Sequence, residues 1–456
     1  MTKHNRAALI AALMTGAAGL MIASPAVAKK DDKKDAAATG QQAPLKLTPA
    51  FQKAALDAQN KIKANDLAGG EAALTAADAQ AKTDDDNYIS AQLHLGLEQA
   101  KLKVASGGDS AKFVAGQAVL IPAINKLIDS PRTAAADKAK YLEFRGNMYY
   151  EGQKYADAAA DFARARDAGS TNPDIGLLIM KSKAESGDID GAAAELQKQI
   201  DAHSAAGQPV PETWYRYIFS KYLKAKNNIQ ANAWSQKLVR AYPTPVNWRA
   251  AIAVYASSVT ATGKLDTRER VDLLRLLRAA NALADENDYN EYAQATDDLG
   301  LYGETLSVID EGTKNGKLPA GNQLAKMLKG SSTTGQGLEK PLTTQEAAAR
   351  AAKTGDLASQ VGDSYLGRGD YTKAAEYYRL ALSKPFEQPT GAATKRHYLT
   401  NDEVTLHLGI ALARGGDKAG AKTALSSITT SPRKEIASFW LTWLDSQSAA
   451  PATTAG

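Results

Sequence analysis

The sequence predicts an all-α chain, an α-solenoid of stacked antiparallel helical hairpins. Apolar residues recur at spacings of three and four, as in "GRGDYTKAAEYYRLAL" (367–382). Short Gly, Asn, Asp or Pro stretches separate alanine-rich amphipathic segments of about 12 to 18 residues. No stretch alternates apolar and polar residues as a half-buried strand does. Together, these three observations predict helices joined by tight turns.

The first 28 residues have the features of an export signal. Lys3 and Arg6 give a basic start, "AALIAALMTGAAGLMIA" is a short apolar run, and Ala26-Val27-Ala28 has the small-x-small cleavage pattern. The run is short and interrupted by Gly, which disfavours a membrane span. We expect cleavage near Ala28 and no transmembrane segment after it; an uncleaved anchor helix is the alternative.

Cysteine content and net charge exclude several kinds of site and partner and indicate where the exported chain is located. The chain contains no cysteine, which excludes disulfides, a cysteine nucleophile and a lipid-modified cysteine after the signal. The formal charge of +5 falls by two when the signal is removed, leaving +3. Such a balance disfavours nucleic acid as a partner. We expect a bacterial periplasmic protein, with full secretion as the other destination.

Segments whose composition interrupts the helical pattern predict the domain organisation. A leader at 29–46 begins with "KKDDKK" and is expected to be disordered, as is the tail at 448–456. "KGSSTTGQGLEKP", rich in Gly, Ser and Thr, predicts a loop or linker at 329–343. This linker divides an N-terminal helical array at 47–328 from C-terminal repeats at 344–447.

Internal repeats are the strongest signal. Twelve positions separate a small residue of the first helix from a small residue of the second, and a bulky residue follows four positions later. The clearest instances are Gly146/Ala158/Phe162, Gly362/Ala374/Tyr378 and Gly409/Ala421/Leu425; the weaker small-residue pairs are Ala58/Gly70, Ser220/Asn232 and Ala293/Thr305. Small residues facing bulky ones allow two helices to interlock at about 8 to 10 Å.

This pattern resembles the tetratricopeptide repeat (TPR), a pair of antiparallel helices repeating every 34 residues. "VGDSYLGRGDYTKAAEYYRLAL", "LGIALARGGDKAGAKTALSSI" and "RGNMYYEGQKYADAAADFARA" carry the resemblance. It is strong for 141–200 and 354–429 and moderate elsewhere between 47 and 320. Many pairs exceed 34 residues, and weak units could be hairpins outside the family. The resemblance implies a superhelix with a concave groove that binds partner segments.

Two smaller motifs are explained by the repeats. Arg368-Gly369-Asp370 matches an adhesion tripeptide, but it falls between the two helices of the best repeat. We therefore interpret it as a turn in which Gly369 takes a positive φ. At the end of the chain, Ile436, Phe439, Trp440 and Trp443 share one face, which predicts a helix capping the last hairpin.

Enzymatic and metal motifs are not recognised. His94 and His407 are expected on helices in structural roles, and no histidine pair has the spacing of metal ligands. Glu185-Ser186-Gly187 is similar to the catalytic string of lytic transglycosylases, but it falls at a repeat corner and the partner motifs of that family are missing. "DIDG" (188–191) lacks the distal Glu of a calcium loop. We predict no catalytic residue, no metal and no cofactor.

The candidate binding residues lie on first helices of hairpins. In "ETWYRYIFSKYLKAK" (212–226), Trp214, Tyr217, Lys221 and Lys224 fall on one helical stripe. Aromatic anchors with long cations suit a peptide or an acidic chain, whereas simple packing with a solvated Lys face is the alternative. This stretch is the predicted centre of the functional groove.

The resemblance adds a second pair of candidate residues. It places Asn147 and Tyr150 in the corresponding groove of another hairpin. Glu143 stands there in place of the Lys that the family's two-carboxylate clamp requires. Recognition of a peptide C-terminus in the family's manner is therefore not expected.

The sequence thus favours a non-enzymatic interaction scaffold of the bacterial periplasm or cell envelope. Its partner is expected to be a protein or peptide held in the concave groove. The alternative is a solenoid that binds or helps to process glycan or peptidoglycan through its aromatic residues. The identity of the partner and the oligomeric state stay open.

Overall fold

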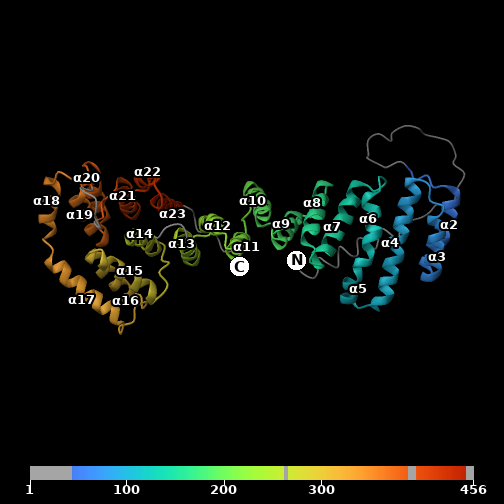
Figure 1. Ribbon diagram of the computed structural model, residues 1–456, viewed down its shortest axis with the longest axis horizontal. Helices are drawn as coiled ribbons and strands as arrows, with labels where there is room; N and C mark the ends of the chain where they lie inside the picture. Colours follow the sequence, from blue (N-terminus) through green and yellow to red (C-terminus); the bar gives the residue numbers. More distant parts are fainter. Residues whose placement is uncertain (1–43, 261–264, 389–396, 448–456) are drawn as a thin grey trace. The chain divides into compact units, whose positions relative to one another are not determined.

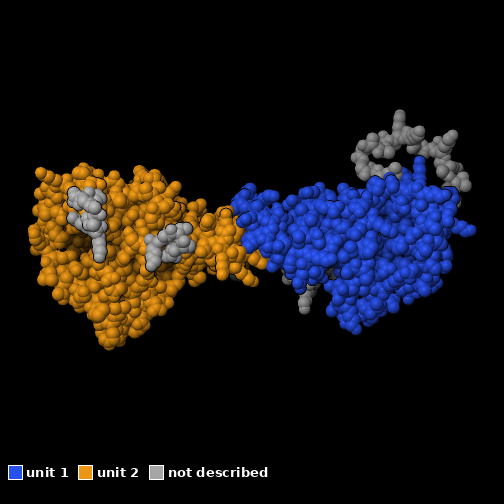
Figure 2. Space-filling model, in the orientation of Figure 1, with its two compact units in different colours: residues 1–210 blue, residues 211–456 orange. Residues whose placement is uncertain are grey.

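A computed structural model describes residues 44–260, 265–388 and 397–447, and all regular structure within these ranges is helical. The predicted all-α fold of hairpins is confirmed. The expected signal peptide, most of the leader and the tail lie outside the described residues. The chain divides into two compact units, Met1–Val210 and Pro211–Gly456 (Figure 2). This boundary falls inside the array that the sequence predicts at 47–328.

Unit 1 is a succession of hairpins in which each helix packs mainly on its neighbours in sequence (Figure 1). Its helices are α2 (Pro49–Lys63), α3 (Leu67–Asp78), α4 (Asp84–Ser106), α5 (Ser110–Gly116), the 3₁₀ turn η1 (Gln117–Leu120), α6 (Ile121–Asp129), α7 (Ala135–Glu151), α8 (Tyr155–Asp167), α9 (Ile175–Ser186) and α10 (Ile189–Ala205).

Two separate apolar clusters lie in unit 1. One gathers around Phe51 and Leu74 of the first hairpin, and the other around Ile124 and Phe162. The segment Ser110–Asp129 is long and apolar enough to match a membrane span by composition. Here α5, η1 and α6 divide it, and Ile124 is fully buried in the second cluster. We therefore treat α6, the buried part of this segment, as a core helix.

Unit 2 contains the remaining helices. They are α11 (Glu212–Lys224), α12 (Asn228–Ala241), α13 (Pro245–Thr260), α14 (Thr267–Ala279), α15 (Glu286–Asp298), α16 (Tyr302–Lys314), α17 (Gln323–Leu338), α18 (Leu342–Ala351), α19 (Asp356–Gly367), α20 (Tyr371–Leu382), α21 (Asn401–Gly415), α22 (Lys418–Ser426) and α23 (Arg433–Ser446).

Unit 2 closes on itself. One continuous core extends from Val239 to Leu444. The predicted capping helix is α23, and its four predicted apolar residues are buried. Beyond covering α21 and α22, α23 packs against α12 and α14, far earlier in the chain (Figure 1). The Tyr255 hydroxyl donates a hydrogen bond to the Pro432 carbonyl oxygen (3.1 Å), and the Tyr255 ring meets Phe439 edge-on.

The interlocking of small and bulky residues occurs in both units. A Cβ added to Gly146 would lie 2.8 Å from the Phe162 ring, and one added to Gly362 would lie 2.6 Å from the Tyr378 ring. Glycine at these positions therefore permits the close helix approach that the repeat pattern predicts.

The Arg368-Gly369-Asp370 tripeptide is a turn, as predicted. Gly369 has a φ of +80°, in the left-handed region, where glycine carries no steric penalty. Asp370 caps α20, because its side chain accepts a hydrogen bond from the Lys373 backbone N–H at 3.1 Å. Local turn chemistry accounts for both residues.

The loop predicted at 329–343 is wrong over most of its length, because α17 continues to Leu338 and α18 begins at Leu342. The small polar residues are held by contacts that a local pattern does not reveal. Ser332 is buried and its hydroxyl donates to Asp297 (2.6 Å). A Cβ on Gly335 would lie 2.5 Å from the Tyr302 ring, so α17 approaches α16 closely there. Tertiary packing overrides weak helix propensity in this segment.

Candidate functional site

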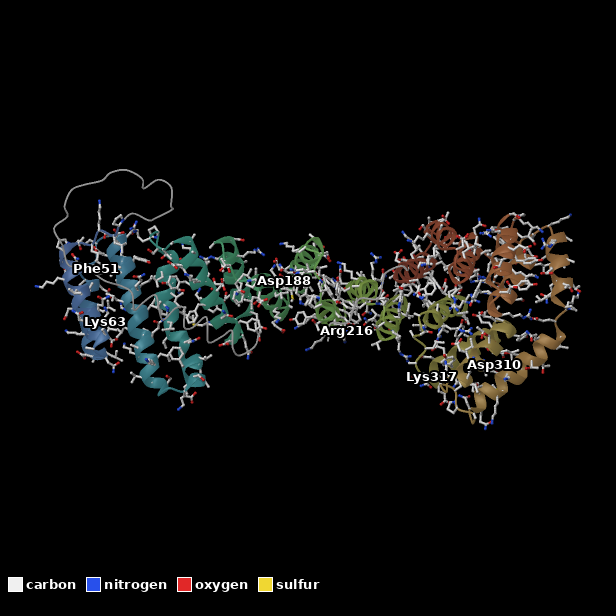
Figure 3. All side chains as sticks on the ribbon, turned by 180° about the vertical axis from the view of Figure 1, so that it is seen from behind. Phe51, Lys63, Asp188, Arg216, Asp310 and Lys317 are labelled. Atoms are coloured by element: carbon white, nitrogen blue, oxygen red, sulfur yellow. The ribbon has the colours of Figure 1, made fainter. Side chains whose placement is uncertain are left out.

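Helix α11 has a buried side, which fixes it in unit 2, and a more exposed one. Tyr215, Ile218 and Tyr222 are buried at helical spacing, which anchors one side of the helix. Polar contacts hold the N-terminal end: Arg216 (Figure 3) pairs with Glu212 at 2.8 Å. The buried Asn247 side chain connects α13 to this end of α11. Arg216 Nη2 donates a hydrogen bond to Asn247 Oδ1 (2.6 Å), and Asn247 Nδ2 donates to Glu212 Oε1 (2.9 Å) and to the Tyr242 carbonyl oxygen at the end of α12 (2.8 Å).

The four predicted residues of α11, here called the α11 face, are Trp214, Tyr217, Lys221 and Lys224. The first three are half-buried and Lys224 is exposed. The Lys221 ammonium lies 5.3 Å from the centre of the Tyr217 ring, a cation–π distance. The structure thus places a cation over an aromatic ring at the solvent boundary. Such an arrangement is chemically suited to ring contact and charge attraction; binding by these residues stays a prediction.

The stretch from the second residue of α11 to the end of α13 carries basic residues and no acidic ones. Between residues 213 and 260 there are seven Lys or Arg and no Asp or Glu, although the whole chain carries 50 acids. Two of these cations are paired with acids outside that stretch, Arg216 with Glu212 and Arg249 with Asp288. Lys237 lies over the buried Trp234 ring at 4.4 Å. The remaining positive charge on this surface lacks acidic neighbours in sequence.

Asn147 and Tyr150 belong to unit 1, and the α11 face belongs to unit 2. Asn147 uses its side-chain amide to donate to the Glu143 carbonyl oxygen one turn earlier, at 2.9 Å. Tyr150 is half-buried, with its ring 5.2 Å from that of Tyr155. Burial, and then the negative charge of Glu185, raise the pKa of Tyr150.

Glu143, at the position where the family clamp has Lys, has a structural role. Its carboxylate is buried and accepts hydrogen bonds from the Ser170 hydroxyl and, at 2.9 Å, from the Asn172 amide. It therefore fixes the connection between α8 and α9. A carboxylate used in this way does not offer a positive charge to a peptide C-terminus, in line with the sequence expectation.

Near Tyr150, an open hollow of about 500 Å³ lies between the start of α8 and the end of α9. Gln153, Lys154, Asp157 and Glu185 are among its lining residues. The Glu185-Ser186-Gly187 string ends here: Ser186 terminates α9 and Gly187 takes a φ of +94°. The string is a helix end, and the hollow is polar and shallow.

The DIDG motif is also structural. Asp188 caps α10 by accepting a hydrogen bond from the Gly191 backbone N–H at 2.9 Å. Within the described ranges, no group of three or more His, Asp or Glu is arranged to hold a metal ion.

A buried charge network in unit 2 was not predicted. Arg275 of α14 makes two hydrogen bonds to Glu304 of α16 (2.9 and 2.7 Å) and one to Asp272 (2.9 Å). His407 of α21 lies between Asp272 and Asp363 of α19, at 3.1 and 3.2 Å. His407 Nδ1 and Asp363 Oδ1 are at ion-pair distance, but their geometry is not that of a hydrogen bond. Four helices distant in sequence meet in this network.

The pKa values in the network follow from this pairing. Burial by itself would lower the pKa of His407, but the charges of Asp272 and Asp363 raise it to about 10. Burial would raise the pKa of Asp363, yet His407 holds it below its ordinary value. His407 is therefore an imidazolium at neutral pH. Because these side chains are enclosed, the network supports a structural role.

A second cluster joins α23 to the same region. Arg433 lies 3.4 Å from Glu269 of α14 and 3.1 Å from the fully buried Glu403 of α21. His397 also contacts Glu403 at 2.8 Å. The only sequence signal for either cluster was the position of His407 beside Leu406 and Leu408. Its acidic partners lie 135 and 44 residues away, beyond any local pattern.

Comparison with known proteins gives limited information. No known family profile and no curated protein matches the sequence. Similar solved structures include the pentatricopeptide repeat protein PPR10 from maize (14% identity, TM-score 0.24) and Naa15/Naa10 bound to HypK-THB (16%, 0.25); these alignments cover 87% and 84% of this chain and 61% and 63% of those chains. The third is yeast Tom70 (12%, 0.21), with 87% and 88% covered.

At these TM-scores the likenesses carry no argument about function. This chain also spans less than two thirds of the first two proteins. The helical repeat fold therefore stands on the hairpins of the chain itself, above all on the interlocked pairs Gly146/Phe162, Gly362/Tyr378 and Gly409/Leu425.

Proposed function

We propose that this protein is a non-enzymatic interaction scaffold of the bacterial periplasm or cell envelope, and that the α11 face binds a partner protein or peptide. The observation that carries the proposal is the mixed character of that face. Trp214 and Tyr217 are half-buried at the solvent boundary, with Lys221 over the Tyr217 ring and Lys224 exposed. Trp and Tyr are enriched where partners bind, and lysines at the rim of such a site add charge complementarity.

The rest of unit 2 supports placing the site on this surface. The buried charge network fills the region where α14, α16, α19 and α21 meet, with Asp272, Glu304 and His407 enclosed. A partner segment would have to displace these ion pairs to enter there. The α11 face needs no such rearrangement.

Glycan binding is the second candidate function. Half-buried aromatic rings can also stack on sugars, and Tyr150 and Tyr155 line or adjoin the polar hollow of unit 1. The two proposals differ in what the α11 face should capture: a protein in the first case, peptidoglycan fragments in the second.

The test combines in-cell crosslinking with substitution of the two rings. Trp214→Ala together with Tyr217→Ala should remove the crosslinked partner or weaken its binding by about 2 kcal/mol or more, because aromatic anchors dominate binding energy. Tyr371→Ala is the control, since Tyr371 is another half-buried tyrosine of unit 2 under a cation.

Thermal unfolding is measured alongside. A double variant that loses several kcal/mol of stability but keeps its partner would show that these rings are core and the site lies elsewhere. Loss of peptidoglycan binding with an unchanged protein partner would instead favour the glycan proposal.

A further inference from the structure

The end of the α11–α12 hairpin combines positive charge with exposed apolar side chains. Lys221 and Lys224 are in the last turn of α11, and Lys226 follows in the turn. Leu223 is 39% exposed and Ile229, in the first turn of α12, is 80% exposed. We call these five residues the hairpin end.

Helix stability explains only part of this composition. Cations in a last turn favour the helix dipole, which accounts for Lys221 and Lys224. Lys226 lies outside the helix, at a φ of +56°, where the dipole effect fades. An exposed Ile at the start of α12 gains nothing from solvent. The combination makes this end of the hairpin a candidate binding surface.

Charge complementarity indicates what covers it. Neither Lys224 nor Lys226 forms an ion pair among the described residues, and the sequence contains no acid from 213 to 265. Some exposed cations elsewhere in unit 2 have acidic partners: Lys329 pairs with Asp310 at 2.7 Å and Arg350 with Glu376 at 2.6 Å. An acidic segment of another molecule would supply carboxylates to Lys224 and Lys226.

We propose that the hairpin end binds an acidic protein segment, one that places Asp or Glu residues against Lys221, Lys224 and Lys226 and apolar side chains against Leu223 and Ile229. This inference rests on the proposed function and names the chemistry of its partner. A protein segment is favoured over an anionic sugar because Leu223 and Ile229 offer aliphatic contacts, which charged glycans do not match.

The probe is a fluorescein-labelled peptide of about twelve residues, rich in Glu and Asp and carrying two Leu, titrated against the full chain. Replacing its acids by Gln and Asn should abolish binding. Replacing Lys221, Lys224 and Lys226 by Gln should weaken binding roughly tenfold and flatten its salt dependence, because close charge pairs control affinity and screening.

The matched control replaces Lys314, Lys317 and Lys326 by Gln. These lysines are also exposed in unit 2, so the charge change is the same (Lys317 is labelled in Figure 3). The control should change peptide affinity less than about twofold. Leu223→Ser with Ile229→Ser should weaken the peptide without changing its salt dependence.

Several results would overturn the inference. Equal weakening by both lysine triples would show diffuse attraction without a site. Binding only to phosphatidylglycerol vesicles, to heparin or to single-stranded DNA would assign the charge to a membrane, a glycan or a nucleic acid. If the lysine triple leaves the crosslinked partner bound while the Trp214/Tyr217 double variant loses it, the proposed function stands and the acidic partner does not.

Discussion

The two units are built from the same hairpins but are held together over different distances along the chain. In unit 1 separate apolar clusters follow one another along the chain, and the buried Arg145–Asp161 pair joins the adjacent helices α7 and α8. In unit 2 one core runs from Val239 to Leu444, and α23 returns to pack on α12 and α14. Unit 1 is a stack, whereas unit 2 is closed.

This difference indicates that a fold made of hairpin repeats can unfold either in one cooperative transition or in steps. When each hairpin touches only its neighbours, stability is nearly a sum of local contributions and unfolding can proceed in steps. When the last helix packs on the first ones, removing it exposes surface at both ends. We therefore expect unit 2 to unfold in one transition and unit 1 to unfold gradually.

The largest expected effect comes from breaking the network that closes unit 2. Arg275→Met leaves Glu304 buried without its cation and leaves Asp272 with His407 as its ion-pair partner, and such a loss costs about 3–5 kcal/mol. Denaturant unfolding of the full chain and hydrogen exchange along α14, α16 and α21 measure it. Arg145→Met in unit 1 is the comparison: its protection loss should stay within α7 and α8, where Asp161 lies 2.6 Å away.

If Arg145→Met loosens all of unit 1, or Arg275→Met only α14 and α16, the contrast between a stack and a closed unit is wrong.

The pH dependence sharpens the same contrast. The folded pKa of His407, about 10, lies above its ordinary 6.5. Its stabilising effect is therefore complete below about pH 6.5 and is lost as pH rises toward 10. His407→Gln should reduce the stability of unit 2 by roughly 3 kcal/mol at neutral pH and should remove most of this alkaline loss. Urea unfolding at several pH values measures both.

The two aspartates that pair with His407 determine how stability changes at acidic pH. The pKa values of Asp272 and Asp363 are lowered, so their contribution is present above about 3.8 and disappears as pH falls further. A wild-type stability that is level from pH 6.5 to 10 would contradict the assignment of His407 as an imidazolium.

A smaller effect is expected where small residues face rings. Gly146→Ala and Gly362→Ala would each place a Cβ within 2.8 Å of an aromatic carbon, and overpacking costs about 1–3 kcal/mol. Because unit 2 is closed, Gly362→Ala should lower the midpoint of its single transition. Gly146→Ala should broaden the transition of unit 1. Calorimetry distinguishes a shift from a broadening.

The smallest effect should be the same in the two units. Gly187 and Gly369 both end a first helix with φ of +94° and +80°, and alanine there costs roughly 1–2 kcal/mol. Equal losses for Gly187→Ala and Gly369→Ala would show that turns contribute locally in each unit. Asp370→Glu keeps the carboxylate and should leave partner binding unchanged; a specific loss of binding would restore the adhesion interpretation.

The sequence by itself determined the hairpins. Helical spacing, turn glycines and the pairing of small with bulky residues sixteen positions apart are local signals, and each was confirmed at Gly362 and Tyr378. The α11 face was also recognisable from local sequence, because Trp214, Tyr217, Lys221 and Lys224 share a stripe within one helix. Whether this face binds a partner stays a prediction.

Only the tertiary structure decided how the hairpins end and close. Ser332 and Gly335 lie in a segment whose composition predicts a loop. Contacts with Asp297 and Tyr302 hold them in α17 instead. Likewise, nothing near His407 in the sequence identifies Asp272, 135 residues earlier, as its partner. Ion pairs and helix contacts between distant segments depend on how all the intervening hairpins pack on one another. The spacing of residues within one hairpin does not determine that packing.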